Sequence, residues 1–295
     1  WGAVSACFVA LVVGGGGVVV LWGGVVAVGG VRGDFVWVGV VVGGVVVVCL
    51  ELAVQPILSM SSHAASGPAV EVLIRLRDER GRLGQTAEFL KPAARYQLMP
   101  QIDRWVINAA LAAIASGEVK LPGHRSAAIN ISGQTLGDEA FLGFVVDALD
   151  RTGVVPTAIC FEVTEQAILS NVQHAQRFIE VLHGIGCEFS LDDFGSGLGS
   201  FSSLKHLPID YLKIDGTYTR NLLSDLVNQE MVAAMIRLAR AMEIRVVAEQ
   251  VERQEDFDWL REAGVDFVQG NFVDVPAAIG GAGKAPAPAY RKLGT

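Results

Sequence analysis

From Glu51 to Gln269 the chain alternates short apolar runs with longer amphipathic ones, and this alternation constrains the fold most. Five segments carry apolar residues at helical spacing: 101–116, 139–151, 172–184, 226–242 and 254–263. Eight runs have the length of strands: 52–58, 70–75, 127–132, 158–164, 187–192, 211–215, 245–249 and 266–269. This pattern predicts an α/β fold, a TIM-type (β/α)8 barrel. A doubly wound open sheet is the alternative, but no glycine-rich dinucleotide turn follows any of these strands.

Polar residues lie inside or at the ends of these apolar strands. They are Glu71, Asn130, Glu162, Asp192, Asp193, Lys213, Asp215, Glu249 and Gln269. Each one alone is explained as a core polar group with a partner. Since function in such a barrel gathers where the strands end, we expect them to converge at one end. So many carboxylates would repel one another unless cations lay between them. The pattern therefore predicts a site for two divalent metals, suited to attack of water on a phosphoester.

The stretch 190–197 reads as a strand that delivers two adjacent aspartates and then breaks into a glycine-containing loop. Side chains alternate along a strand, so Asp192 and Asp193 can share one site only where the backbone turns out of the sheet. Hard oxygen ligands of this kind favour magnesium, manganese or calcium. A solvated Asp-Asp turn is the alternative for this stretch taken alone.

Residues 1–50 differ from the rest, because they are mostly valine and glycine with only Arg32 and Asp34 charged. Two interpretations stay open: a membrane hairpin, since the apolar runs are long enough to span a bilayer, or a low-complexity segment. Valine and glycine are poor helix formers, which argues against the hairpin. We accordingly divide the chain into segment 1–50, a barrel at 51–279 and a flexible tail at 280–295.

Charge and cysteine content limit the partners and the compartment. The net charge is −8, and no basic tract is present, which argues against binding to DNA or RNA. The four cysteines are scattered without metal-type spacing, so a reducing compartment is expected. We expect a cytoplasmic protein, or one on the cytoplasmic face of the bacterial inner membrane if residues 1–50 insert.

Eight short segments combine these polar residues with characteristic neighbours: Val54-Gln55-Pro56-Ile57, Glu71-Val72-Leu73-Ile74-Arg75, Asn130-Ile131-Ser132, Glu162-Val163-Thr164-Glu165, Asp192-Asp193-Phe194-Gly195-Ser196-Gly197, Leu212-Lys213-Ile214-Asp215, Val247-Ala248-Glu249-Gln250-Val251-Glu252 and Val268-Gln269-Gly270. In these segments the sequence resembles the EAL-domain family of cyclic-di-GMP phosphodiesterases, and the resemblance extends from Glu51 to about Pro276. Their order and spacing match the family. The chain departs from the family pattern at four places. Val72 lies in the signature segment that begins at Glu71, Val54 precedes Gln55, and Ala94 lies in a helix outside the metal site. The fourth place is the segment after Gly270, where the last helix is expected to be altered or missing.

The resemblance implies a chemistry and the residues that perform it. Cyclic-di-GMP would be hydrolysed to linear pGpG with two Mg²⁺ or Mn²⁺ ions. Glu249 would be the general base toward the attacking water, Lys213 would position that water, and Asp193 would assist catalysis. The implied metal ligands are Glu71, Asn130, Glu162, Asp192 and Asp193. The residues placed on the substrate side are Gln55, Arg75, Asp215 and Gln269.

In the family, the loop after Asp193 couples dimerisation to metal binding. The resemblance therefore assigns this coupling to Glu165, Phe194, Gly195, Ser196 and Gly197, and it implies a homodimer. A degenerate module that binds cyclic-di-GMP without cutting it, as a receptor or scaffold, is the alternative. Such receptors usually lack several metal ligands or the general base, and here none is missing.

Overall fold

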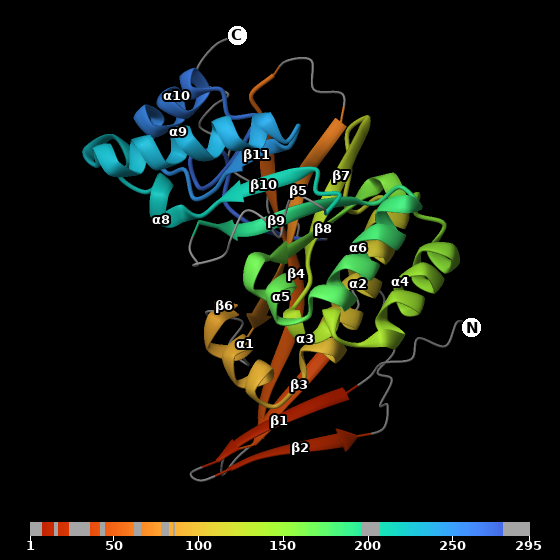
Figure 1. The fold of residues 1–295 in the computed structure, drawn as a ribbon. Helices are drawn as coiled ribbons and strands as arrows, with labels where there is room; N and C mark the ends of the chain where they lie inside the picture. The colour runs from red at the N-terminus through yellow and green to blue at the C-terminus, as the bar shows by residue number, and fades with distance from the viewer. Residues whose placement is uncertain are drawn as a thin grey trace.

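The computed structural model describes residues 8–14, 17–23, 36–41, 45–61, 66–77, 83–84, 86–195 and 207–279. Eight strands form a closed barrel in the order β4, β12, β11, β10, β9, β8, β7, β5, and β5 pairs with β4 to close it (Figure 1). They are β4 (Val45–Ser59), β5 (Ser66–Arg77), β7 (His124–Asn130), β8 (Ile159–Thr164), β9 (Glu188–Phe194), β10 (Tyr211–Ile214), β11 (Arg245–Ala248) and β12 (Phe267–Gln269). The predicted barrel is confirmed.

The direction of β4 distinguishes this barrel from a regular (β/α)8 fold. β4 is antiparallel to both of its barrel neighbours, β5 and β12, whereas the other neighbouring strands run parallel. Only residues 60–65 connect β4 to β5. A parallel connection needs a crossover of a dozen or more residues, so a link this short reverses the chain direction.

The five predicted helices are present, with ends that differ by no more than two residues from those expected. They are α2 (Met99–Ala115), α4 (Glu139–Thr152), α6 (Val172–Gly184), α9 (Leu226–Ala241) and α10 (Gln254–Ala263). In Figure 1, α2, α4 and α6 group on one side of the barrel, and α9 and α10 on another. Together with α1 (Thr86–Arg95) they surround the strands and bury apolar faces against them.

Three short helices that the sequence did not predict follow barrel strands directly. They are α3 (Gly133–Leu136), α5 (Glu165–Ser170) and α8 (Gly216–Thr219). Each begins at a polar N-cap: Ser132 accepts from the Thr135 amide, Thr164 from the Ala167 amide, and Asp215 from the Thr217 amide. They follow the carboxyl ends of β7, β8 and β10, so they stand around the end of the barrel that we call the mouth. Two 3₁₀ turns, Pro156–Ala158 and Leu222–Ser224, complete the helical elements described.

The described parts of the first 50 residues are strands. β1 (Phe8–Gly14) pairs antiparallel with β2 (Gly17–Gly23), and β3 (Val36–Val41) pairs antiparallel with the first half of β4. β4 itself crosses the expected boundary at residue 51 without interruption. Among the described residues, none of the helices combines the length and the apolar character needed to cross a bilayer. The predicted tail, 280–295, lies outside the described residues.

Apolar and aromatic side chains fill the interior of the barrel below the mouth. Ile57, Ala128, Cys160, Tyr211, Val247 and Phe267 form this interior cluster. At the amino-terminal ends of the strands, Glu188 accepts hydrogen bonds from the Tyr211 hydroxyl at 2.7 Å and the Ser126 hydroxyl at 2.6 Å. Glu188 and its partners thus tie together strands β7, β9 and β10 at this end of the barrel.

That the last helix, after Gly270, is altered or missing stays a prediction, because the structure describes the chain only as far as residue 279. β13 (Ala277–Ala278) pairs antiparallel with β4 at Val54 and Ala53, and no helix occurs within the described residues 270–279. The chain thus returns along the edge of β4 after β12.

Gly270 begins this segment, and we expect Gly270→Ala to destabilise the protein by about 2–4 kcal/mol. An added Cβ would lie 2.2 Å from the Val251 carbonyl oxygen and 2.3 Å from its amide nitrogen, both backbone atoms that cannot rotate away. The backbone there also has a φ of +152°, which an L residue rarely adopts. Urea unfolding measures the change in free energy.

The matched control is Gly143→Ala, on the exposed surface of α4, where an added Cβ meets no atom within 4 Å. We expect that variant to gain up to about 1 kcal/mol, since alanine is the better helix former. Equal stability of the two variants would contradict the proposed close approach at Gly270.

Candidate active site

Lys213 is the centre of the polar cluster at the mouth. It lies on β10, and its side chain is 1% exposed. Its Nζ lies 2.7 Å from Oε1 of Glu249, 3.0 Å from Oε1 of Glu162, 3.3 Å from Oδ1 of Asp192 and 3.6 Å from Oε2 of Glu71. They come from four further strands. Glu162, Asp192 and Glu249 lie near the ends of β8, β9 and β11, whereas Glu71 lies in the middle of the long strand β5. One ammonium group therefore faces four carboxylates, and the cluster carries an excess of negative charge.

Burial and this crowding change the proton affinities of the cluster. Burial disfavours the charged form of Lys213, but the surrounding carboxylates outweigh it and raise the pKa of Lys213 well above its usual value. Burial raises the pKa of Glu249 to about 8, against the attraction of Lys213. Burial also raises the pKa of Glu162 well above its usual value. Burial and then Asp192 raise the pKa of Asp193 to about 6. The site thus lacks positive charge.

Glu71, on β5, is the carboxylate that the protein itself keeps ionised. Its Oε1 accepts from Asn130 Nδ2 at 2.7 Å, and its Oε2 accepts from Gln269 Nε2 at 2.6 Å. Burial opposes ionisation, but Lys213 and these two hydrogen bonds outweigh burial and lower the pKa of Glu71. Since the Asn130 amide donates to Glu71, its carbonyl oxygen is left as a ligand atom for a cation.

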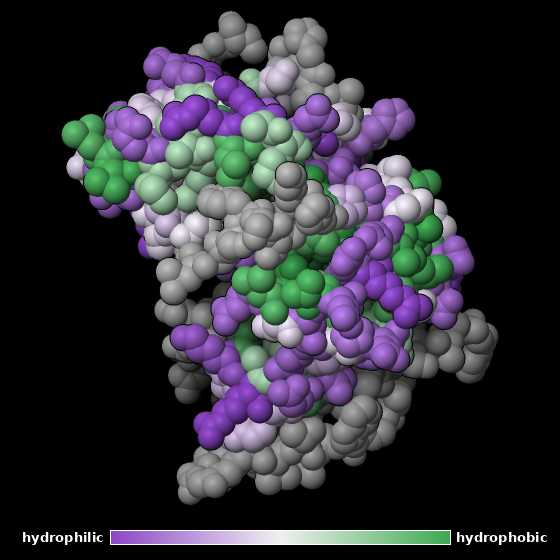
Figure 2. Space-filling model, viewed as in Figure 1, coloured by the Kyte–Doolittle hydropathy of each residue, from purple (hydrophilic) through white to green (hydrophobic). Residues whose placement is uncertain are grey.

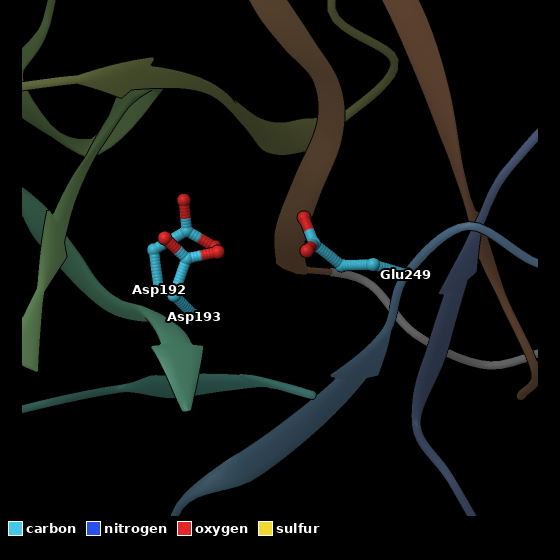
Figure 3. A group of neighbouring side chains, drawn as sticks. All are labelled: Asp192, Asp193 and Glu249. Atoms are coloured by element: carbon cyan, nitrogen blue, oxygen red, sulfur yellow. The ribbon is translucent and has the colours of Figure 1, made fainter. Parts of the chain in front are cut away.

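The geometry of Asp192, Asp193 and Glu249 suits a divalent cation. One carboxylate oxygen from each lies within 4.8 Å of the others, and Figure 3 shows the two aspartates facing Glu249 across the mouth. Oε2 of the buried Glu162 has no hydrogen-bond partner. A buried carboxylate oxygen without a hydrogen-bond partner, next to other hard oxygen ligands, suits the coordination of Mg²⁺ or Mn²⁺. The residues present therefore fit the metal that the sequence predicts.

The backbone explains how neighbouring aspartates reach one site. Asp193 has a φ of +53°, in the left-handed region. The pairing of β9 with β10 shifts register here, since Leu191 pairs with Leu212 but Phe194 pairs with Ile214. One extra residue on β9 is a bulge, and a bulge redirects a side chain that regular alternation would turn away. The expected turn out of the sheet is therefore wrong in this respect: Phe194 still pairs with Ile214, and a bulge within β9 redirects Asp193 instead.

The EAL domain family model matches residues 49–276 of this chain. The chain belongs to the EAL domain family. Among its relatives is the cyclic di-GMP phosphodiesterase PdeB of Shewanella oneidensis, 34% identical over 230 residues, which cover 78% of this chain and 27% of PdeB. The chain thus spans little more than a quarter of that relative.

Two solved structures resemble this EAL domain in fold. The FimX EAL domain from Pseudomonas aeruginosa bound to c-di-GMP is 27% identical with a TM-score of 0.70, over 77% of this chain and 90% of that one. Klebsiella pneumoniae BlrP1, in a manganese/cyclic-di-GMP complex, is 27% identical with a TM-score of 0.67, over 78% of this chain and 56% of that one. A structural neighbour of this EAL domain therefore holds a divalent metal together with the dinucleotide.

Two of the residues predicted to contact the substrate of the EAL domain, Gln55 and Gln269, are connected by hydrogen bonds to the predicted metal ligand Glu71. Gln269 donates to Oε1 of Gln55 at 3.1 Å as well as to Glu71, and Gln55 donates to the Asp274 carbonyl at 3.0 Å. Arg75, on β5, is half-buried, and it donates to the Ile74 carbonyl at 2.9 Å. Gln55 and Gln269 thus join the cluster around Glu71, whereas the Arg75 guanidinium donates to the Ile74 carbonyl of its own strand and to the Thr86 hydroxyl of α1.

Asp215 interacts with Asp193, and three of the five predicted coupling residues lie among the described residues. Asp215 caps α8 and contributes to the raised pKa of Asp193. Glu165 is buried at the start of α5, and Phe194 is buried at the end of β9. Gly195 follows with a φ of +92°. The last two coupling residues, Ser196 and Gly197, lie outside the described residues.

The sequence reasoning missed two hydroxyl groups next to this site, those of Tyr218 and Thr219 on α8. Each donates to a backbone carbonyl close to an acidic residue of the cluster. A hydrogen bond between a side chain and a distant carbonyl leaves no pattern in the sequence, so no motif pointed to either residue.

Proposed function

We propose that this EAL domain hydrolyses cyclic-di-GMP to linear pGpG. The observation that carries the proposal is the placement of Glu249 at the mouth, 2.7 Å from the Lys213 ammonium and beside Asp192 and Asp193. A base, a fixed positive charge and a group of oxygen ligands are the parts needed for attack of water on a phosphodiester. The named activity of PdeB and the dinucleotide in the FimX complex support the same substrate.

Glu249 is the proposed general base. Burial raises its pKa to about 8, so the Glu249 carboxylate has a higher proton affinity than an exposed glutamate, as a general base needs. The Glu249 carboxylate would take the proton of the attacking water, and Lys213 would orient that water and offset the negative charge that develops on the phosphate. Asp193, the exposed neighbour of Asp192, would share in this step.

Two Mg²⁺ or Mn²⁺ ions are the proposed cofactors. The proposed ligands are Glu71, Asn130, Glu162, Asp192 and Asp193. When bound, the ions would supply positive charge that favours the ionised carboxylates and polarises the scissile phosphate. Gln55, Gln269, Asp215 and Arg75 are the proposed contacts to the dinucleotide. Arg75 donates to the Ile74 carbonyl through Nη1, so its Nε and Nη2 could hold a phosphate in bidentate fashion while that bond stays in place.

A catalytically inactive receptor is the second candidate, since the FimX EAL domain is a neighbour described only as bound to c-di-GMP. The complete set of ligands with a base at Glu249 favours the enzyme. A receptor would need a binding site for the dinucleotide, but it would not need a base held next to an ammonium group, as Glu249 is next to Lys213.

Hydrolysis of cyclic-di-GMP by the full chain tests the function, with pGpG followed by chromatography. We expect product with Mg²⁺ or Mn²⁺ and none with excess chelator, because the single positive charge of Lys213 does not balance the negative charge of the carboxylates around it. Calcium should bind without supporting turnover, since it tolerates looser coordination than the near-octahedral Mg²⁺ site. Tight nucleotide binding without product in Mg²⁺ and Mn²⁺ would favour the receptor instead.

Glu71→Ala serves as the ligand variant in this experiment. It removes two accepted hydrogen bonds and a proposed ligand, so we expect Mn²⁺ affinity to fall at least about tenfold by calorimetric titration. The exposed Glu230→Ala on α9 is the matched control and should titrate like the parent protein. A Glu71→Ala titration identical to the parent would remove Glu71 from the ligand set.

We also infer a cytoplasmic homodimer. Cys160 and Cys187 are buried free thiols, in keeping with a reducing compartment. Large apolar side chains lie exposed at the start of α9, where Leu226 is 76% and Val227 is 70% exposed, and Figure 2 shows apolar surface at this corner of the molecule. Apolar patches often mark protein interfaces. Sedimentation of the parent and of Leu226→Lys tests this, since a dimer at this surface should dissociate in the variant.

A further inference from the structure

The acidic residues at the mouth are carried by backbone that is held in uncommon conformations. Asp193 has a φ of +53° and Gly195 a φ of +92° where β9 leaves the sheet. On the opposite side, Gln250, directly after Glu249, has a φ of +51°. For residues other than glycine such conformations cost about 1–3 kcal/mol and persist only where the surroundings enforce them. Contacts with other parts of the protein must therefore hold the segments at Asp193 and Gln250 in these conformations.

The short helix α8 contacts both segments through consecutive residues. The Tyr218 hydroxyl donates to the Gly195 carbonyl at 2.5 Å, two residues after Asp193. The Thr219 hydroxyl donates to the carbonyl of Glu249 itself at 2.5 Å. Thr219 is 1% exposed, so its hydroxyl makes this bond away from solvent.

Further contacts fix α8 against the Glu249 side. The Arg220 guanidinium donates to Oε1 of Gln250. Gly216 lies so close that a Cβ there would come 2.2 Å from the Gln250 side chain. The N-cap of α8, Asp215, follows Lys213 on β10 by two residues. The position of α8 is therefore tied to the strand that carries the central ammonium group.

We propose that Tyr218 and Thr219 are positioning residues, and that their hydroxyls brace the backbone beside Asp193 and Glu249 at a fixed separation. The proposal rests on the proposed roles of these two acidic residues. Their carboxylate oxygens lie within 4.8 Å of each other, so a small movement of either segment changes both the metal site and the base. A misplacement of about 1 Å can lower a rate about a hundredfold.

Thr219→Val and Tyr218→Phe test the brace, because each removes one hydroxyl and keeps most of the side-chain volume. We expect Thr219→Val to lower kcat by about 10–100-fold with KM for cyclic-di-GMP within about twofold. Thr219→Ser keeps the hydroxyl and should restore kcat to within about threefold of the parent. Tyr218→Phe should weaken Mn²⁺ binding several-fold by calorimetric titration. Thermal unfolding of the metal-free proteins reports whether each variant is folded.

Thr217→Val, on the same helix but exposed, is the matched control and should keep the parent kcat and Mn²⁺ affinity. Parent-like kcat and Mn²⁺ affinity in both Thr219→Val and Tyr218→Phe would overturn the brace. So would a loss in Thr219→Val that serine does not restore, or an equal loss in Thr217→Val. If the parent protein itself makes no pGpG, the proposed function fails, and the Mn²⁺ titrations still decide whether the two hydroxyls position the site.

Discussion

Glu249→Gln is expected to lower kcat for cyclic-di-GMP hydrolysis by about 10²–10⁴-fold, the usual contribution of general base catalysis. The amide keeps the size of the side chain but cannot accept the proton of water. Nucleotide binding should survive, because Gln55 and Gln269 hold the opposite side of the mouth through their own hydrogen bonds. Steady-state kinetics and a separate binding titration with cyclic-di-GMP measure the two effects.

The matched control is Glu262→Gln, on the exposed surface of α10 and outside the family motifs, which should retain the parent kcat. The Glu249→Ala variant should abolish turnover as well. The nucleotide affinity of that variant is harder to interpret, because alanine also removes the carboxylate that contacts the Lys213 ammonium. Unchanged turnover in Glu249→Gln would remove Glu249 from the mechanism.

Lys213→Met is expected to destabilise the metal-free protein by about 3–5 kcal/mol. The substitution keeps an unbranched buried chain but removes the ammonium group that faces Glu71, Glu162, Asp192 and Glu249. The remaining buried carboxylates would repel one another unless they bound protons or a cation. Urea unfolding in chelator measures the loss, and added Mn²⁺ should recover part of it by replacing the missing positive charge.

The exposed Lys120→Met is the matched control and should change stability by less than about 0.5 kcal/mol. If Lys213→Met does not fold, the double variant Lys213→Met/Glu71→Gln decides the matter. It also removes the carboxylate whose pKa is lowered, and it should be more stable than Lys213→Met alone. Equal stability of Lys213→Met and the parent in chelator would refute charge balance as the role of Lys213.

The residues at the strand ends could be read from the sequence because two local rules govern them. Apolar runs of strand length placed the barrel strands, and a polar residue inside such a run can be tolerated only where it finds partners. Asp192 and Asp193 illustrate the reach of this reasoning. Their adjacency predicted that the chain leaves the sheet there, whereas the structure keeps Phe194 paired with Ile214 and redirects Asp193 by a bulge with a φ of +53°.

Other features depended on connections and contacts that local patterns do not encode. The reversed direction of β4 follows from its short link to β5, and its start at Val45 follows from pairing with β3. Arg75 matched the family motif, yet its guanidinium bonds to the Ile74 carbonyl. The choice among hydrogen-bond acceptors is made by distances in space, and residue type does not reveal it.

The sequence by itself determined the barrel, the acidic residues at its mouth and the family, because periodicity and motif spacing are properties of the chain. Only the tertiary structure decided that Lys213 contacts four carboxylates, that Glu71 is held ionised while Glu249 has a pKa of about 8, and that α8 contacts both sides of the mouth. The physical reason is that proton affinity and backbone placement depend on burial and on separations between strands. Those quantities exist only once the barrel has closed.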